Sequence, residues 1–403
     1  MRSRGETGTG ISRRGLLGAV GLAAAGAAGC GAPAGDGGGS PQAGHVTAPP
    51  PEGVLGANFN GDPSTMTFAE LQAVSATWLR GFFPMPDAEQ GPPEGRPAIG
   101  ALLTAAGRGY GTVLSLKFPF DRRPLPVPGS TAMAAELQRL DKVLPVVLNR
   151  VDILAIGNEP FIETRAADRG DRLNDFYETI ARHVTAYRAE HFGDKCKTRL
   201  YMGALNHLDR PAWRTPAAER WMRFVRETPS IDGVDIHPHL PAPAAGQRYL
   251  DYVLPRMRPE QRFLATEFSL VLLWKKHLSD PVAPAFADRY SVPRGTPVWR
   301  VLKNAIDHPF PQRQWDDLLA MSPWFAAHRT FLWEQMDRFR RTGRLAVATY
   351  GVGQDAAMVR DFGPDKTPWL LNSLFCPYTV QPSGGLPGRN RAWTDAFRAL
   401  QHT

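Results

Sequence analysis

The stretch Leu154-Ala155-Ile156-Gly157-Asn158-Glu159-Pro160 sets the pattern by which the rest of the chain is interpreted. A short apolar run of this kind is typical of a strand buried on both faces, and polar residues follow it directly. The same order, an apolar run and then a polar residue, recurs along the chain. The runs are Val54–Asn58, Ala76–Phe82, Thr112–Lys117, Val151–Ile156, Arg199–Leu205, Gly233–His237, Arg262–Thr266 and Leu345–Tyr350.

Amphipathic segments separate these runs. In residues 174–191, large apolar side chains recur at helical spacing, which predicts a helix with one buried face. The other segments expected to be helical are Thr67–Val74, Ala98–Gly107, Met133–Val147, Ala217–Glu227 and Tyr249–Met257. Strands that alternate with helices predict an α/β protein with parallel strands, and eight such strands favour a closed (β/α)8 TIM barrel. The alternative is an open doubly wound sheet, but Asn58-Phe59-Asn60-Gly61 after the first run is no phosphate-binding loop.

The N-terminal segment has the composition of an export signal. Arginines precede an apolar, small-residue stretch over residues 16–28, which is too short to span a bilayer. Ser12-Arg13-Arg14-Gly15-Leu16-Leu17 resembles a twin-arginine signal, and Ala27-Ala28-Gly29-Cys30 resembles a bacterial lipobox. We therefore expect residues 1–29 to be removed. We also expect Cys30 to be lipidated; the alternative is cleavage nearby without a lipid.

The sequence predicts a tether and one large domain after the signal. Residues 30–52 are mostly Gly, Ala, Pro, Ser and Gln, too few of them apolar to repay the entropy of ordering, so we expect a flexible linker. Residues 53–403 are expected to form the barrel. A long insertion between the seventh and eighth strands, from about residue 269 to residue 344, contains five tryptophans. Strand-to-helix loops lie at the catalytic face of a barrel, so this insertion is expected to shape a binding site.

Composition excludes several classes of partner. The net charge is +8, but no Lys/Arg cluster is dense enough to predict binding to nucleic acid. The chain has three cysteines, and beyond Cys30 only Cys196 and Cys376 remain, which is no disulfide framework.

We expect a monomer outside the cytoplasm, secreted or held at the outer face of the cytoplasmic membrane by the lipid alone. No cofactor is expected.

Two strand-end motifs carry a resemblance to a known group of enzymes. Gly157-Asn158-Glu159-Pro160 closes the fourth run, and Thr266-Glu267-Phe268 closes the seventh. Both motifs resemble clan A of the retaining glycoside hydrolases, which includes cellulases, mannanases and xylosidases. The resemblance implies hydrolysis of O-glycosidic bonds in a poly- or oligosaccharide, with Glu159 as acid/base and Glu267 as nucleophile. Double displacement needs these carboxyl groups about 5–5.5 Å apart.

The resemblance also assigns substrate-binding roles. Asn158 corresponds to the asparagine that binds the sugar 2-hydroxyl, and Arg80 to the arginine beside the nucleophile. His237 and His239 stand where clan members carry His-x-Tyr, so the usual tyrosine contact to the nucleophile is replaced. The clan's tryptophan platform after the eighth strand is not found there, and Trp274 or Tyr350 is expected to replace it.

The expected electrostatics separate the two carboxyl groups. Arg80 should lower the pKa of Glu267 and keep the nucleophile ionised, whereas burial and the charge of Glu267 should raise the pKa of Glu159. Other interpretations stay open: an inactive carbohydrate-binding lipoprotein, or a transglycosylase that uses the same residues. His237-Pro238-His239 also raises the question of a metal, but the first run has no matching histidines, so no metal site is predicted.

Overall fold

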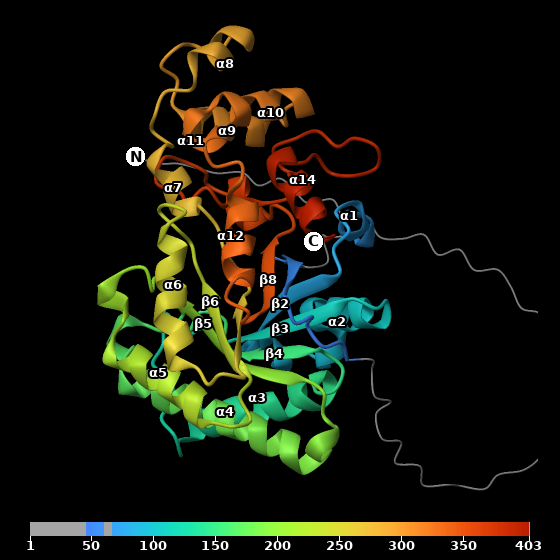
Figure 1. Ribbon diagram of the computed structural model, residues 1–403, viewed down its shortest axis with the longest axis vertical. Coiled ribbons are helices and arrows are strands. Elements are labelled where there is room, and N and C mark those ends of the chain that lie inside the picture. Colours follow the sequence, from blue (N-terminus) through green and yellow to red (C-terminus); the bar gives the residue numbers. More distant parts are fainter. Residues whose placement is uncertain (1–45, 60–66, 403) are drawn as a thin grey trace, which may run out of the picture. The chain divides into compact units, whose positions relative to one another are not determined.

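The computed structural model describes residues 46–59 and 67–402, so the expected signal, Cys30 and most of the tether lie outside the described residues. Eight parallel strands close into a barrel in sequence order, with β8 paired to β1 (Figure 1). They are β1 Val54–Asn58, β2 Trp78–Pro84, β3 Gly111–Lys117, β4 Ile153–Ile156, β5 Arg199–Asn206, β6 Gly233–His237, β7 Arg262–Ala265 and β8 Leu345–Gly351. The predicted (β/α)8 barrel and its eight strands are confirmed.

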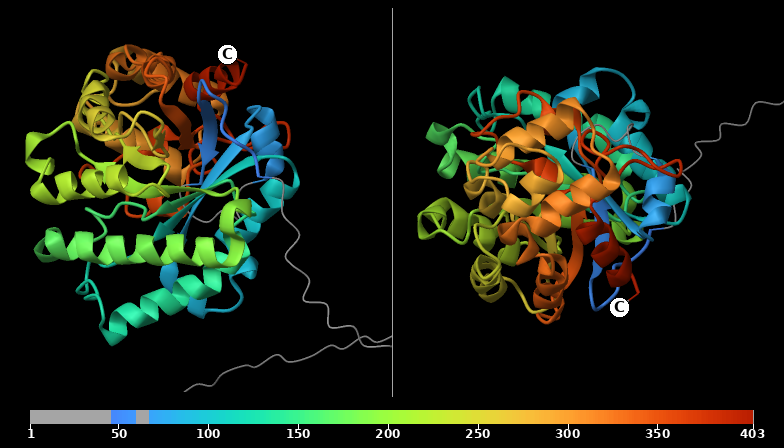
Figure 2. Two further views of the ribbon diagram at one scale, coloured as in Figure 1. Left: turned by 60° about the horizontal axis from the view of Figure 1, so that its bottom comes forward. Right: turned by 90° about the horizontal axis from the view of Figure 1, so that it is seen from above.

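Helices surround the barrel. Those that follow the first six strands are α1 Phe68–Ala73, α2 Pro97–Gly107, α3 Thr131–Val147, α4 Asp171–Phe192, α5 Pro216–Glu227 and α6 Ala245–Val253. The long helices α3 and α4 lie side by side on the outside of the sheet (Figure 2). Two of the starts are capped by a hydroxyl: Ser130 accepts from the backbone N–H of Met133, and Thr215 accepts from that of Ala218.

The inside of the barrel is filled by a layer of apolar side chains. Trp78 from β2 fills much of this space together with Val113, Ile153 and Leu264. A Cβ on Gly111 would lie 2.2 Å from the Trp78 ring, so only glycine leaves room for the indole on β3. Arg80, two residues further along β2, points to the same face one layer closer to the carboxyl ends of the strands. The apolar layer therefore forms a floor beneath the polar residues at that end.

The insertion between β7 and β8 is mostly helical. It contains α7 Val271–Lys276, α8 Pro284–Arg289, α9 Val298–Asp307, α10 Gln312–Met321, α11 Pro323–Ala326 and α12 Phe331–Arg340. Helices α8 to α11 gather at the top of Figure 1, next to the C-terminal helix α14 Arg391–Leu400. Among the described residues, no helix is both long and apolar enough to cross a membrane. Cys196 and Cys376 are free.

A long irregular segment joins β8 to α14. It contains the short helices α13 Ala356–Val359 and η8 Trp369–Asn372. The side chain of Asp355 caps α13 by accepting from the backbone N–H of Met358 at 3.0 Å. This segment, residues 352–390, is called the β8–α14 loop below.

Candidate active site

Glu159 lies in the turn that follows β4. Gly157 begins this turn with a φ of +104°, a backbone conformation that residues other than glycine rarely adopt. A Cβ there would also lie 2.9 Å from Pro160 and from Tyr177. The glycine thus allows the chain to turn sharply, and Asn158 and Glu159 follow at the end of the barrel.

Glu267 lies across the barrel mouth, two residues after the end of β7. One carboxylate oxygen of Glu159 and one of Glu267 lie within 4.8 Å of each other. Each side chain is 20% exposed, so both are mostly buried but reachable from solvent. An oxygen separation of this size fits the short spacing of a retaining pair, about 5–5.5 Å, better than the 6.5–9.5 Å that an inverting pair needs for its water.

Arg80 holds two side chains in place, the nucleophile candidate Glu267 and the amide of Asn158. The guanidinium is completely buried and donates to Glu267 Oε1 at 2.7 Å and to Asn58 Oδ1 at 2.9 Å. It also donates to Asn158 Oδ1 and to the hydroxyl of Ser115. Because a buried guanidinium needs its N–H groups paired, this network fixes the position of both Glu267 and Asn158.

Asn158 is held from its other side as well. Its amide donates to Glu163 Oε1 at 2.8 Å, and the same carboxylate oxygen pairs with the ammonium of Lys117 at 2.8 Å. One amide hydrogen of Asn158 is therefore engaged, and within the described part of the chain the second is left without an acceptor.

Two side chains contact a single oxygen of Glu159. The amide of Asn206, at the end of β5, donates to Glu159 Oε1 at 2.6 Å. His237 Nδ1 lies 3.0 Å from the same oxygen. Asn206 was not predicted as a site residue, although its position as the polar residue after the run Arg199–Leu205 is the same signal that indicates Glu159.

The two histidines of β6 and its loop lie between the carboxylates. His237 is completely buried, and its Nδ1 lies 3.9 Å from Glu267 Oε2 as well as 3.0 Å from Glu159. His239 Nε2 lies 3.6 Å from Glu267 Oε2, and its Nδ1 lies 2.9 Å from the hydroxyl of Ser269. His239 thus takes the place beside the nucleophile that the resemblance gives to a tyrosine.

The surroundings favour the ionised form of Glu267. Burial raises the pKa of a carboxyl group, but here the positive charges of His237 and Arg80 and the contact with His239 prevail. The pKa of Glu267 therefore lies well below its usual range. The expectation for Glu267 agrees with this, and His237 adds to the effect of Arg80.

Glu159 differs from the expectation. Burial and the charge of Glu267 do act to raise its pKa, but the hydrogen bond and the charge of His237 outweigh them, and the pKa of Glu159 is lowered. His237 itself is buried, which disfavours its charge, yet the charge of Glu267, the Asp235 carboxylate 3.6 Å from Nε2 and the hydrogen bond to Glu159 raise its pKa to about 10. The two carboxyl groups are thus distinguished by their partners, Arg80 for one and His237 for the other.

A divalent cation is a further occupant to consider, because one ligand atom from each of Glu159, His237, His239 and Glu267 lies within 4.8 Å of the others. The groups around these four side chains favour hydrogen bonds and bound protons over a metal ion. A guanidinium already neutralises Glu267, and the Asn206 amide points a donor at Glu159. No metal is assigned to the cluster.

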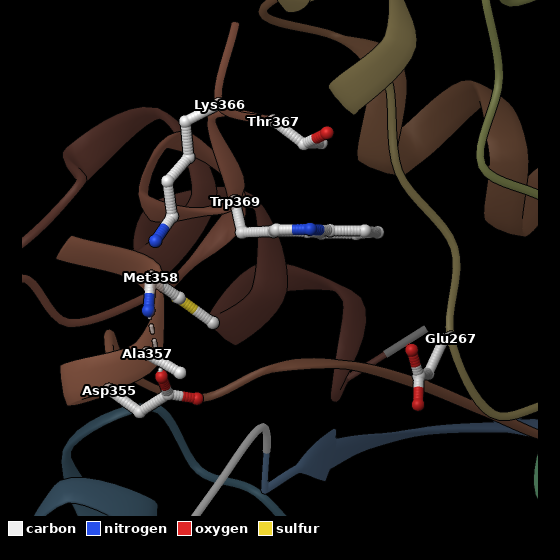
Figure 3. Close-up of a pocket in the computed structure, with 7 residues that line it drawn as sticks. All are labelled: Glu267, Asp355, Ala357, Met358, Lys366, Thr367 and Trp369. Atoms are coloured by element: carbon white, nitrogen blue, oxygen red, sulfur yellow. Dashed lines mark hydrogen bonds between the residues drawn. The ribbon is translucent and has the colours of Figure 1, made fainter. Parts of the chain in front are cut away.

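A cavity of about 450 Å³ opens beside Glu267. Apart from Glu267, its walls come from the β8–α14 loop, in particular from Met358, Lys366 and Trp369. Figure 3 shows the indole of Trp369 reaching toward Glu267, while Lys366 and Asp355 lie at the far side of the cavity. The Trp369 ring also meets the His239 ring edge to face, with centroids 4.7 Å apart.

Two predicted binding residues do not reach this cavity, and those predictions are wrong. Trp274 is completely buried and packs on Phe325, with ring centroids 5.0 Å apart. Tyr350 is also completely buried, and its hydroxyl donates to Asn372 Oδ1 at 2.7 Å. Neither side chain has a free face to offer a sugar. Trp369, from the β8–α14 loop, lines the cavity instead.

Comparison with known proteins adds to the description of the fold. No family model matches the chain, and no curated protein sequence matches it significantly. Among solved structures, a glucosidase from Croceicoccus marinus matches with 13% identity and a TM-score of 0.50, over 87% of this chain and 67% of that one. The likeness is one of fold.

Two further matches are weaker. A Gas2p variant from Saccharomyces cerevisiae has 10% identity and a TM-score of 0.45, over 87% of this chain and 60% of that one. A β-1,4-mannanase of glycoside hydrolase family 113 has 8% identity and a TM-score of 0.41, over 86% and 97%. The chain thus spans about two thirds of the glucosidase and somewhat less of Gas2p, but nearly all of the mannanase.

Proposed function

We propose that the protein is a retaining glycoside hydrolase that cleaves O-glycosidic bonds of an oligo- or polysaccharide. The observation that carries the proposal is the opposed pair Glu159 and Glu267, with oxygens within 4.8 Å and with different charged partners. A barrel fold shared with a glucosidase supports a carbohydrate substrate.

The geometry supports a double displacement in which Glu267 attacks the anomeric carbon. Its low pKa keeps it ionised, and Arg80 holds one oxygen, leaving Oε2 for the attack. In the first step the bond from Glu267 to the anomeric carbon forms, the glycosidic C–O bond breaks, and Glu159 in its protonated form gives its proton to the leaving oxygen. Because the pKa of Glu159 is lowered, the protonated form of the free enzyme is populated toward acidic pH. In the second step a water attacks the anomeric carbon, its proton passes to Glu159, and the carboxylate of Glu267 is released.

The cavity beside Glu267 is proposed to bind the sugar whose anomeric carbon reacts. Trp369 supplies an apolar face for the sugar ring, and Asn158 retains an amide hydrogen for a hydroxyl. Lys366 and Asp355, at the far side, can bind hydroxyl groups of the sugar ring or of the next residue in the chain.

The expected export also remains a proposal. We infer that the protein acts outside the cytoplasm, anchored through lipidated Cys30 or secreted, and that it works as a monomer. Treating cells with labelled fatty acid tests the anchor: label in the wild type and none in Cys30→Ala would support it, and label in both would overturn it.

The nucleophile assignment is tested by Glu267→Ala. A panel of aryl glycosides first identifies a sugar that the wild type cleaves. Glu267→Ala should then lose turnover of every substrate, because no glycosyl-enzyme can form. Asp355→Ala, a carboxylate in the same cavity, is the matched control and should raise KM without abolishing turnover. Full activity of Glu267→Ala would show that the assignment is wrong.

The acid/base assignment is tested by Glu159→Ala. General acid catalysis contributes on the order of 10²–10⁴-fold, so turnover of natural glycosides should fall by about that factor. An activated aryl leaving group departs without protonation and should be affected less. Added azide should rescue the variant and give a glycosyl azide of retained configuration. Binding of sugars by a wild type that turns over none of them would instead identify a carbohydrate-binding protein.

A further inference from the structure

Asp235 is a buried carboxylate on β6 that the proposed mechanism does not use. It lies two residues before His237 and is completely buried. Its Oδ1 accepts from the backbone N–H of Thr266 at 3.0 Å, and its Oδ2 accepts from the hydroxyl of Thr266. The other neighbour of that hydroxyl is His237 Nε2, at 2.8 Å.

The hydrogen atoms in the series of contacts from Asp235 through Thr266 to His237 can be placed by counting donors. A hydroxyl has one hydrogen, and Thr266 gives it to the carboxylate of Asp235, which has none to offer. Toward His237 the hydroxyl oxygen can then only accept, so His237 Nε2 carries a hydrogen. Asp235 Oδ2 lies 3.6 Å from the same nitrogen and supports that hydrogen electrostatically.

The opposite nitrogen of His237 faces the acid/base. Nδ1 lies 3.0 Å from Glu159 Oε1, which also accepts from Asn206. Because the pKa of Glu159 is lowered, its ionised oxygen can only accept, so Nδ1 also carries a hydrogen and His237 is a cation. Oε1 then receives two N–H groups, so the proton that Glu159 exchanges with substrate belongs on Oε2.

We propose that Asp235 is a positioning residue that acts through Thr266 to keep His237 doubly protonated, so that His237 fixes which oxygen of Glu159 carries the catalytic proton. The inference rests on the proposed function. His237 keeps both protons through both steps of the reaction: the proton leaves Glu159 Oε2 for the leaving oxygen and returns to Oε2 from water.

Several charged groups face His237 and define its environment. Glu159 comes from the β4 end, Glu267 from the β7 end, and Asp235 from β6 itself. The His239 ring lies 6.0 Å from the His237 ring, and Arg80 is on the other side of Glu267. The three carboxylates outweigh the cations nearest to His237, which agrees with its pKa of about 10. The charge is therefore present below that pH and is lost as the pH rises through it.

Asp235→Asn tests the proposal with nearly unchanged shape. An amide at Oδ2 would donate to Thr266, which reverses the threonine hydroxyl and directs its hydrogen at His237 Nε2. His237 then becomes neutral at neutral pH. The positive charge beside Glu159 is then lost, so the pKa of Glu159 should rise, and the alkaline limb of the kcat/KM profile, which reports the protonated acid, should move to higher pH by about one pH unit or more. Thr266→Val, which removes the hydroxyl and keeps the branched shape, should move the limb in the same direction.

Asp152→Asn is a matched control at the other end of the barrel. Asp152 is also buried, and its Oδ2 accepts from the backbone N–H of Thr112 at 2.6 Å and from its hydroxyl at 2.7 Å. It precedes β4, whereas Glu159 follows that strand. Loss of stability should therefore be similar in Asp152→Asn and Asp235→Asn, but the pH profile of Asp152→Asn should match the wild type.

The protonation of His237 is read separately by NMR of its ring nitrogens. This measurement needs no turnover, so it distinguishes failure of the inference from failure of the proposed function. We expect both nitrogens protonated at pH 7 in the wild type and in Asp152→Asn, and one protonated in Asp235→Asn. A neutral His237 in the wild type, an unchanged His237 in Asp235→Asn, or pH profiles that coincide in the two Asn variants would overturn the proposal.

Discussion

The insertion between β7 and β8 and the β8–α14 loop differ in whether their aromatic residues are buried or line the cavity beside Glu267. The insertion is long, helical and rich in tryptophan, but Trp274 and Trp315 are completely buried within it. The β8–α14 loop is shorter and irregular, and it supplies most of the cavity wall beside Glu267. Aromatic content alone therefore does not indicate which segment lines a site.

The insertion has a supporting role instead. Helix α7 packs against η8, the short helix that begins at Trp369. The amide of Asn372 in η8 donates to the backbone carbonyl of Phe268 at 3.4 Å, and Tyr350 donates to the same side chain. The residues just after β7 thus hold the base of the loop that carries Trp369, and the contrast predicts that changes in the two segments affect different quantities.

Trp274→Ala should have the largest effect, and on stability. Removing a buried indole costs about 3–5 kcal/mol of the free energy of unfolding. The kcat of the folded fraction should stay near that of the wild type, because Trp274 does not reach the cavity. Denaturant unfolding and kinetics below the transition check both quantities. A large rise in KM with unchanged stability would restore Trp274 as a binding platform.

Trp369→Ala should change substrate binding more than stability. The indole is half-buried and forms part of the cavity wall, so we expect a small change in stability. Loss of the apolar contact with the sugar ring should raise KM on the order of 10-fold, with kcat less affected. Trp369→Phe should recover part of the loss. An unchanged KM for the alanine variant would remove the β8–α14 loop from the binding site.

Lys366→Ala should have a smaller effect of the same kind. Its ammonium donates to the backbone carbonyl of Arg360, and its side chain borders the cavity. Loss of one hydrogen bond to substrate corresponds to about 0.5–1.5 kcal/mol, so KM should rise about 2- to 10-fold. Lys303→Ala, which breaks a surface ion pair with Asp307 in the insertion, is the control and should leave KM unchanged. Equal effects of both substitutions would argue against a contact between Lys366 and substrate.

The fold could be predicted because each step of the barrel leaves a local pattern in the sequence. Strands of a parallel barrel are buried on both faces, so they read as apolar runs, and all eight were found. The site residues that end these strands could be placed for the same reason. Arg80, Glu159 and His237 lie within one network because the carboxyl ends of the strands meet at one end of the barrel.

The remaining features depend on packing between distant segments. Whether Trp274 or Trp369 faces the cavity is decided by how the insertion and the β8–α14 loop pack, and no local pattern records this. The lowered pKa of Glu159 likewise depends on the charge of His237, which the carboxylates of Glu267 from the β7 end and Asp235 from β6 favour. Asn206 could have been predicted, because it is the polar residue that follows an apolar run, the same signal that indicates Glu159.

The stereochemistry of the wild-type reaction tests the central claim most directly. Proton NMR can follow the anomeric configuration of the first sugar released from a cleaved glycoside, before mutarotation mixes the two anomers. Opposed carboxylates with oxygens within 4.8 Å predict that the first product retains the configuration of the substrate. A first product of inverted configuration would contradict double displacement at Glu267 and with it the roles given to this pair.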